Sequence, residues 1–255
     1  MKKMYWGGIA VAICLTSSPA FAVFTNGGFE TGTITGWTLE GGYNPYDNVQ
    51  NVVWGASGYS PIVAVIDNNG SMPYQTLDIN PYNGNHMVRI NDIYGGSDAT
   101  KIWQEDTISQ TDLDNGGVLY VNWGAALIEP ANEHPKGAQP FFGINVYKNG
   151  APINSFYADA LDHTGWTNAG GYDGTLWYKS DQWSFNLSSF TIGDKIKIEL
   201  YAVDCDWGGH GGYAFLDGIG TVKPPPPAVP EPTTMLLFGT GLAGLVGFGR
   251  RRNRK

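Results

Sequence analysis

The sequence predicts an all-β domain, a jelly-roll β-sandwich, that lies between two sorting signals. Apolar and β-branched runs recur between clusters of Gly, Asn, Asp and Pro, a pattern typical of strands joined by turns. No stretch of the central part keeps an apolar helical period over several turns. Many short strands with glycine-rich turns favour a sandwich or jelly roll over a helical or an α/β fold.

Nine segments of the central part have the composition of strands. Residues 195–200 alternate polar and apolar side chains, as in a sheet with one solvated face. Asn149-Gly150 joins two of the segments, and this dipeptide favours a two-residue hairpin turn. The expected strands are 61–67, 87–92, 100–109, 118–129, 141–148, 153–160, 176–187, 195–203 and 213–222.

The N-terminal segment 1–22 predicts a cleaved signal peptide. Two lysines precede an apolar run at 6–15, and residues 18–22 end in the Ala-x-Ala pattern of a cleavage site. The mature chain is therefore expected to begin at Val23, with its folded domain over residues 23–222.

The C-terminal end predicts a second signal. A proline-rich linker at 223–229 leads to a tail at 230–255, in which an uncharged run at 233–249 is followed by a basic end at 250–255. We expect the uncharged run to form a single transmembrane helix with its basic end in the cytoplasm, although a buried helix is the alternative. The residues expected to carry the signal are Pro230, Glu231, Pro232, Arg250, Arg251 and Arg252.

This order of short motif, apolar span and basic end resembles the PEP-CTERM tail of bacterial surface and exopolysaccharide-associated proteins. The resemblance implies a partner, the membrane protease-transpeptidase called exosortase, which recognises and processes such tails. It also implies a protein that is anchored in the membrane or released to the cell surface and extracellular matrix. It implies a location and leaves the activity open.

The charge of the chain narrows the choice of ligand. The net charge is −8, and seven of the 15 Lys and Arg residues lie in the two signals, so the central domain is strongly acidic. Such a domain is not expected to bind nucleic acid through charge. Cations and neutral molecules are the ligand classes that an acidic domain favours. The alternative is that the acidic surface serves only to keep the protein soluble.

Two segments resemble the first and last strands of galactose-binding-like jelly rolls, which include many carbohydrate-binding modules. They are 26–30 (Asn-Gly-Gly-Phe-Glu), followed by Gly36-Trp37, and 213–217 (Tyr-Ala-Phe-Leu-Asp). The resemblance implies a structural Ca²⁺ held by Glu30 and Asp217, and hard cations do favour carboxylate ligands. The alternatives are that both are surface acids or that Glu30 accepts backbone hydrogen bonds. Residues 112–117 resemble part of a calcium loop, but a plain turn is expected there.

A second resemblance covers residues 119–217. It is similar to a jelly-roll domain of secreted, adhesin-like bacterial proteins, and the residues that carry it are Glu129-Pro130, His134, Gln139-Pro140, Asp204-Cys205 and 208–214. His134, His210, Asp204 and Cys205 would suit a transition metal if they converge together with Glu129. The alternative is that the two histidines bond to loop backbone and pin two loops. Cys205 has no disulfide partner in the mature chain, and we expect a buried, inert thiol.

Aromatic residues suggest a sugar-binding surface. The segment 166–178 is polar and glycine-rich, and Trp166, Tyr172, Trp177 and Tyr178 are the candidates for stacking on a sugar ring. A second candidate is 43–47. Aromatic residues in strands are more often core, and this assignment is made for Trp103, Trp123 and Trp183.

The sequence therefore predicts an exported, exosortase-sorted surface protein that binds a glycan such as exopolysaccharide without catalysis. The alternative is a structural or adhesive matrix protein with no small ligand. A glycan-active hydrolase or lyase is the remote alternative, because no Gly-x-Ser-x-Gly or His-Glu-x-x-His motif is present.

Overall fold

The structure is a computed structural model that describes residues 23–45, 51–67, 77, 79–92, 94–129, 134–135, 138–159, 161, 164–170 and 175–223. The expected signal peptide at 1–22, the linker beyond Lys223 and the whole sorting tail lie outside the described residues. Within the described part, no helix is long and apolar enough to cross a membrane.

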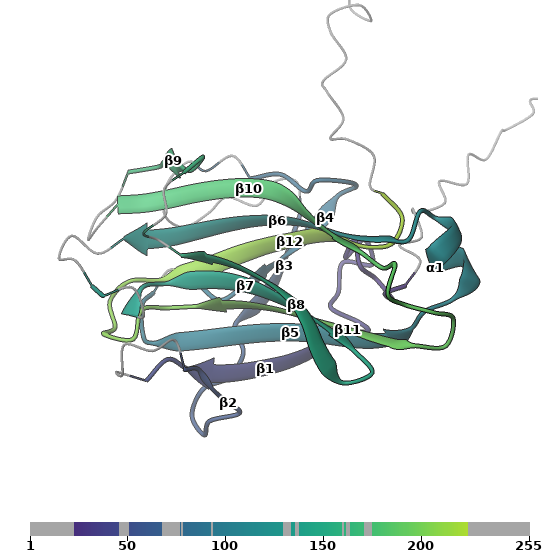
Figure 1. Cartoon of the computed structure of the whole chain (residues 1–255). Coiled ribbons are helices and arrows are strands. Elements are labelled where there is room, and N and C mark those ends of the chain that lie inside the picture. The colour runs from purple at the N-terminus through teal and green to yellow at the C-terminus, as the bar shows by residue number, and fades with distance from the viewer. Residues whose placement is uncertain are drawn as a thin grey trace, which may run out of the picture.

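Two six-stranded sheets form a jelly-roll β-sandwich, which confirms the expected fold class (Figure 1). One sheet has the order β2-β1-β5-β11-β7-β8 and the other β3-β4-β12-β6-β10-β9, and the neighbouring strands pair antiparallel. The strands of the first sheet are β1 (Thr38–Tyr43), β2 (Val53–Trp54), β5 (Asp98–Thr107), β7 (Phe141–Lys148), β8 (Ala151–Asp159) and β11 (Lys195–Val203). Those of the second are β3 (Val63–Asp67), β4 (His86–Ile90), β6 (Val118–Glu129), β9 (Thr167–Asn168), β10 (Thr175–Asn186) and β12 (Gly212–Gly220).

The nine expected strands are all present, and β6, β7 and β11 have the expected bounds. The turn between β7 and β8 confirms the hairpin prediction. Asn149 and Gly150 have φ angles of 50° and 81°. Two consecutive positive φ angles are those of a type I′ turn, whose twist matches the strands it joins.

The expected opening strand at 26–30 is wrong. This segment folds as turns, with Asn26 at φ 54° and Phe29 at φ 55°, and the first strand begins only at Thr38. Phe29 is completely buried and packs against Trp37 with ring centroids 5.6 Å apart. The segment therefore covers one end of the core, and it is joined to β12 by the hydrogen bond from the Ile219 N–H to the Gly27 carbonyl at 2.9 Å.

Helix α1 (Gln110–Asp114) lies at one end of the sandwich (Figure 1). The helix begins with a capping box formed by Ser109 and Asp112. Asp112 Oδ1 accepts a further hydrogen bond from Thr221 Oγ1 at 2.7 Å. Leu113 packs against the core. Residues 112–117, which were expected to form a plain turn, thus include the end of a capped helical turn. This turn closes one end of the core between the two sheets.

The core lies between the sheets and contains one face of every long strand. Trp123 on β6 is 4% exposed and stacks on Phe142 of the opposite sheet at 5.3 Å, as expected for a packing residue. Trp183 is partly buried against the same core. Trp103 departs from the prediction, because it lies on the outer face of its sheet with Lys197 Nζ 4.6 Å above its ring.

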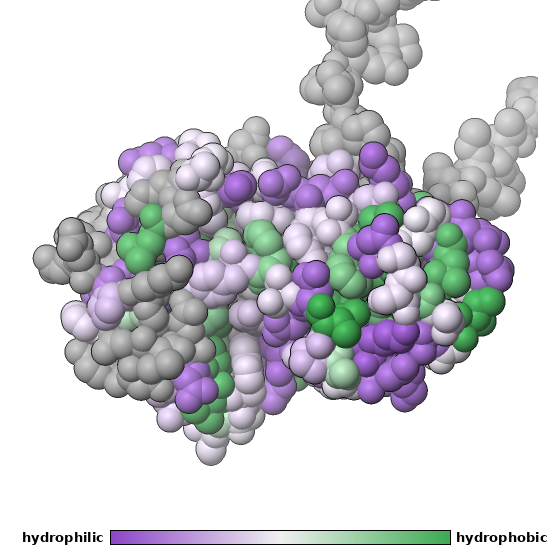
Figure 2. Space-filling view, in the orientation of Figure 1, coloured by the Kyte–Doolittle hydropathy of each residue, from purple (hydrophilic) through white to green (hydrophobic). Residues whose placement is uncertain are grey.

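Figure 2 shows hydrophilic residues, in purple, interspersed with smaller hydrophobic patches on the side of the molecule seen in Figure 1. Among the described residues, a second apolar cluster lies outside the main core, on the outer face of the sheet that contains β12, β6 and β10. It consists of Ile79, Met87, Ala126, Leu176, Tyr213 and Phe215. These side chains are buried although they lie outside the main core, so neighbouring segments cover part of this outer face.

Candidate functional site

A pocket of about 510 Å³ opens on that outer face. Its floor is formed by β12, β6 and β10, and the segment from Ile79 to Tyr82 forms a wall. The lining combines apolar and aromatic side chains with a few polar ones, which is the usual composition of a ligand site. The principal lining residues are Ile79, Tyr82, Met87, Asn122, Tyr178, Gln182, Phe215 and Asp217.

A row of three polar residues crosses the floor of the pocket. Gln182 on β10, Asn122 on β6 and Asp217 on β12 are Cα partners in adjacent strands. Gln182 Nε2 donates to Asn122 Oδ1 at 2.8 Å. Asn122 Nδ2 and Asp217 Oδ1 are buried and have no hydrogen-bond partner among the described residues. One donor and one acceptor in the pocket floor are therefore unpaired in this structure, and such buried groups call for an explanation.

Tyr178 lies over the middle of the floor. Its hydroxyl is so close to Gly124 that a Cβ there would be 2.9 Å from the hydroxyl oxygen. The pKa of Tyr178 is raised, chiefly because burial disfavours the phenolate. Gly124 thus provides the space in which the tyrosine ring lies against the sheet and contributes an aromatic surface to the pocket.

Glu30 and Asp217, the expected calcium ligands, both hold the loop that precedes β4. Glu30 Oε1 accepts from the backbone N–H groups of Asn85 and His86, at 3.0 Å each, and Asp217 Oδ2 accepts from the Asn83 N–H at 2.9 Å. The alternative in which Glu30 accepts backbone hydrogen bonds is therefore realised. A carboxylate has about four lone-pair sites, so these bonds leave room for a cation as well.

The pKa of Asp217 is raised to about 7, chiefly by burial and in smaller part by the nearby charge of Glu30, while the backbone N–H groups of Asn83, Gly218 and Tyr82 act in the opposite direction. The side chain is 3% exposed. A carboxyl group with such a shift, in the wall of a pocket, is typical of a functional site. The charge of Glu30 affects the pKa of Asp217, which means that the two carboxylates lie near each other.

The aromatic segment 166–178 does not form one surface among the described residues. Trp166 packs on the core side, with its ring 6.5 Å from that of Trp123, whereas Tyr178 belongs to the outer-face pocket. Trp177 is next to Tyr178 on β10 and so points to the opposite face, where its Nε1 donates to Glu129 Oε2 at 2.8 Å. Tyr172 lies outside the described residues.

The correction to the aromatic surface follows from strand geometry, because consecutive side chains of a strand cannot share a face. The end of this segment lies in β10, which begins at Thr175, close to the start of the expected strand at 176–187. The residues that were missed are Asn122 and Gln182. Asn122 could have been found from the sequence, because it is the one asparagine in the largely apolar strand β6. A buried amide in such a strand needs a hydrogen-bond partner.

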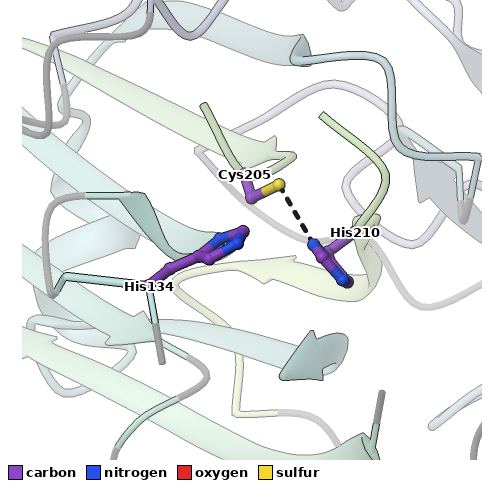
Figure 3. A group of neighbouring side chains, drawn as sticks. All are labelled: His134, Cys205 and His210. Carbon is purple, nitrogen blue, oxygen red and sulfur yellow. Dashed lines mark hydrogen bonds between the residues drawn. The ribbon is translucent and has the colours of Figure 1, made fainter. Parts of the chain in front are cut away.

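A second cluster lies at the end of the sandwich away from α1. Figure 3 shows the imidazole of His134 pointing toward Cys205 and His210. The Cys205 Sγ is 3.4 Å from His210 Nδ1, and the possible ligand atoms of the three residues lie within 4.8 Å of one another. The structure thus brings together three of the residues that the sequence left open as a metal site. Of the other two, Glu129 bonds to Trp177, and Asp204 has a separate role.

The electrostatics of this cluster follow from burial. Burial raises the pKa of the Cys205 thiol to about 11, partly offset by the backbone N–H groups of His210 and Trp207. Burial lowers the pKa of His134, partly offset by the charge of Asp206. In the absence of an ion, the thiol is therefore protonated and His134 is neutral at neutral pH, so a pre-formed thiolate nucleophile is not present.

Asp204 joins both sheets beside this cluster. It is completely buried, and its Oδ1 accepts from Asn91 Nδ2 and from the Gly212 N–H, each at 2.9 Å. Its Oδ2 accepts from the Gly96 N–H at 3.2 Å. Burial raises its pKa well above the usual range. These bonds connect the end of β11 to the ends of β4 and β12, which is a structural role.

A family model for the PEP-CTERM protein-sorting motif matches residues 228–254 of the chain. This agrees with the resemblance of the C-terminal tail, and such a motif marks an exported protein that is sorted at the cell envelope. A comparison with curated proteins finds no match.

Solved structures that are similar to the chain include carbohydrate-binding modules and a cyclase. The structure of TmCBM61 in complex with β-1,4-galactotriose has 16% identity and a TM-score of 0.41, and the match covers 80% of this chain and 97% of that one. The CBM27-1 module of Caldicellulosiruptor saccharolyticus in complex with mannohexaose has 13% identity and a TM-score of 0.36, covering 76% and 93%. A cyclase from Fischerella sp. TAU has 12% identity and a TM-score of 0.39, covering 77% and 93%. All three TM-scores are below 0.5, and these similarities carry no inference about function.

Proposed function

We propose that the protein is a non-catalytic glycan-binding protein of the cell envelope, and that the sugar binds in the pocket formed by Asn122, Tyr178, Gln182 and Asp217. The observation that carries the proposal is the unpaired donor and acceptor in the polar row on the pocket floor. Sugar hydroxyls donate and accept hydrogen bonds, so one hydroxyl pair satisfies both groups.

The aromatic lining supports a sugar over other small polar ligands. The apolar face of a pyranose ring packs on aromatic side chains, and the ring of Tyr178 adjoins the polar row. The carboxyl group of Asp217 and the acidity of the chain disfavour acidic polysaccharides. A neutral glycan is therefore the proposed ligand class.

The pocket supports binding more than hydrolysis. A glycosidase needs two carboxyl groups on either side of the scissile bond. The carboxylates in the pocket lining are Asp181 and Asp217. Asp181 precedes Gln182 on β10 and is the Cα partner of Trp123, a core residue, so its side chain starts from the other face of the sheet.

Replacing Asn122 by alanine should weaken glycan binding about tenfold, because it removes the free amide donor and the support of Gln182. The free energy of unfolding should fall by only about 1 kcal/mol, since the hydrogen bond from Gln182 Nε2 is lost but the amide nitrogen has no partner among the described residues. Isothermal titration with neutral β-linked galactose, mannose and glucose oligosaccharides measures the first, and urea unfolding the second.

The matched control for this experiment is Trp103→Ala, which removes an aromatic ring from the outer face of the other sheet. It should leave glycan affinity unchanged. If none of the oligosaccharides or the parent polysaccharides binds, or if Asn122→Ala and Trp103→Ala bind as the wild type does, the pocket is not a glycan site. The structural or adhesive matrix role would then be favoured.

We also propose that Ca²⁺ binds at Glu30 and Asp217, beside the pocket wall. The donor chemistry fits a hard cation, because both carboxylates accept hydrogen bonds from the backbone of one loop and keep further lone pairs that can coordinate an ion. An ion there would neutralise two neighbouring charges and fix the loop from Tyr82 to His86. The loop carries part of the pocket wall, so the cation would support the glycan site.

Calcium at one hundred times its dissociation constant should raise the melting temperature of the full chain by about 5–10 °C relative to EDTA. Glu30→Gln and Asp217→Asn should each abolish most of this rise, since each removes a charged ligand. Asp114→Asn, in the segment that resembles part of a calcium loop, is the control and should keep it. An equal rise in all variants would assign calcium to another place, and no rise in the wild type would remove the site.

The C-terminal tail gives the proposed location. We propose that exosortase recognises Pro230, Glu231 and Pro232, and that the run at 233–249 anchors the protein in the membrane until the tail is processed. The glycan pocket would then face the exopolysaccharide outside the cell.

A further inference from the structure

We propose that His134, Cys205 and His210 form a binding site for a transition-metal ion, with Zn²⁺ as its occupant. The site lies at the end of the sandwich away from α1, and its residues come from two loops: His134 follows β6, and Cys205 and His210 lie in the loop between β11 and β12 (Figure 3). It is independent of the proposed glycan pocket, so the two proposals succeed or fail separately.

The donor atoms and their spacing fit zinc. One thiolate and two imidazoles are the ligands of borderline metal ions, whereas hard cations prefer oxygen. Zinc–sulfur and zinc–nitrogen bonds of about 2.3 and 2.0–2.1 Å place the two donors roughly 3.5 Å apart in a tetrahedron. The distance between Cys205 Sγ and His210 Nδ1 is 3.4 Å, and all three donors lie within 4.8 Å of one another. A small movement of the side chains would bring all three donors to this spacing.

His134 supplies an independent observation. The residue is 7% exposed, and its Nδ1 is buried with no hydrogen-bond partner among the described residues. A buried polar nitrogen without a partner costs free energy. Its ring points at the other two donors in Figure 3, so a bound ion explains both its orientation and its burial.

The backbone around the cluster is already fixed. The His134 carbonyl accepts from Gln139 Nε2 at 2.8 Å, and the Cys205 N–H donates to the His210 carbonyl at 3.0 Å. Gly208 and Gly209, at φ 71° and 92°, allow the tight loop between the two ligands. The donors are therefore held near one another before an ion binds, which reduces the entropy lost on binding.

The same residues do not fit a nucleophilic Cys–His pair. Cys205 is completely buried, so a substrate has no access to its sulfur. With three protein ligands, a fourth tetrahedral position remains for water or another small ligand. The ion would join the segment after β6 to the loop between β11 and β12 at this end of the domain.

Cobalt titration tests the proposal on the full chain, purified without a histidine tag, reduced and freed of metal, in buffer that contains excess Ca²⁺. One equivalent of Co²⁺ should produce a thiolate-to-cobalt charge-transfer band and the intense visible bands of tetrahedral cobalt, and Zn²⁺ should displace it. Cys205→Ser should lose the charge-transfer band. His134→Gln and His210→Gln should each weaken Co²⁺ binding at least tenfold, whereas His86→Gln, outside the cluster, should bind normally.

A second measurement needs no variant, which keeps the test valid if a variant fails to fold. In the metal-free wild type, alkylation of Cys205 under partly denaturing conditions should slow at least tenfold when Zn²⁺ is added. A charge-transfer band with unit stoichiometry and zinc protection of the thiol support the site. Absence of the band in the wild type, or alkylation that is unaffected by Zn²⁺, overturns it.

Discussion

Asp204→Ala is expected to lower the free energy of unfolding by about 2–4 kcal/mol, because a fully buried carboxyl group that accepts three hydrogen bonds is lost and the buried Gly212 N–H is left without an acceptor. The donors are the side-chain amide of Asn91 and the backbone N–H groups of Gly96 and Gly212. An unsatisfied buried donor costs about 1–3 kcal/mol, and the methyl group of alanine offers no substitute. Urea unfolding followed by circular dichroism measures the loss.

Asp204→Asn is the matched control for this prediction. Its amide oxygen keeps one acceptor in place, whereas its NH₂ group faces a donor, so it should be less destabilised than the alanine variant. Asp114→Ala, on the surface of α1, should change stability by less than about 0.5 kcal/mol. An alanine variant at position 204 that unfolds within about 1 kcal/mol of the wild type would contradict the view that this carboxyl group joins the sheets.

The strands that could be predicted from the sequence are those whose patterns are uninterrupted. β6, β7 and β11 alternate or run apolar from end to end. β1 was missed because Gly41 and Gly42 give it the composition of a turn. The structure explains them, because a Cβ on Gly41 would lie 2.3 Å from the Tyr59 carbonyl oxygen and one on Gly42 2.6 Å from that of Val53. A close tertiary approach is not encoded in local periodicity.

The candidate sites show the same limit. The resemblance to galactose-binding-like jelly rolls pointed to Glu30 and Asp217, and the structure brings both to the loop before β4. The proposed glycan pocket, in contrast, depends on the register of β6, β10 and β12, which are far apart in sequence. Asn122 and Gln182 look like ordinary residues of an alternating strand until that register is known. His134 lies far from Cys205 in sequence, and only the meeting of the ends of β6 and β11 shows that they can share an ion.

Asp217→Asn is expected to make the protein more stable than the wild type at pH 8 in EDTA, by on the order of 3–4 kcal/mol. The folded-state pKa of Asp217 is raised from 3.8 to about 7. Below pH 4 the group is protonated in both states. Between pH 4 and 7 the unfolded state loses this proton while the folded state keeps it, so the stability that the protonated group contributes is lost as the pH rises. Asparagine carries no proton to lose and removes this dependence.

The groups that face Asp217 make the stability of the wild type at pH 8 depend on calcium. Glu30 adds negative charge, His86 Nδ1 lies 3.8 Å from Glu30 Oε2, and the Asn83 N–H already bonds to Asp217. Glu30 adds no positive charge that could offset an ionised Asp217, whereas a bound Ca²⁺ would stabilise the ionised form. Adding calcium at pH 8 should therefore restore the wild type and leave Asp217→Asn unchanged. Urea unfolding of both chains from pH 4 to 8 measures the difference, and parallel profiles in EDTA would show that this carboxyl group does not titrate near neutrality.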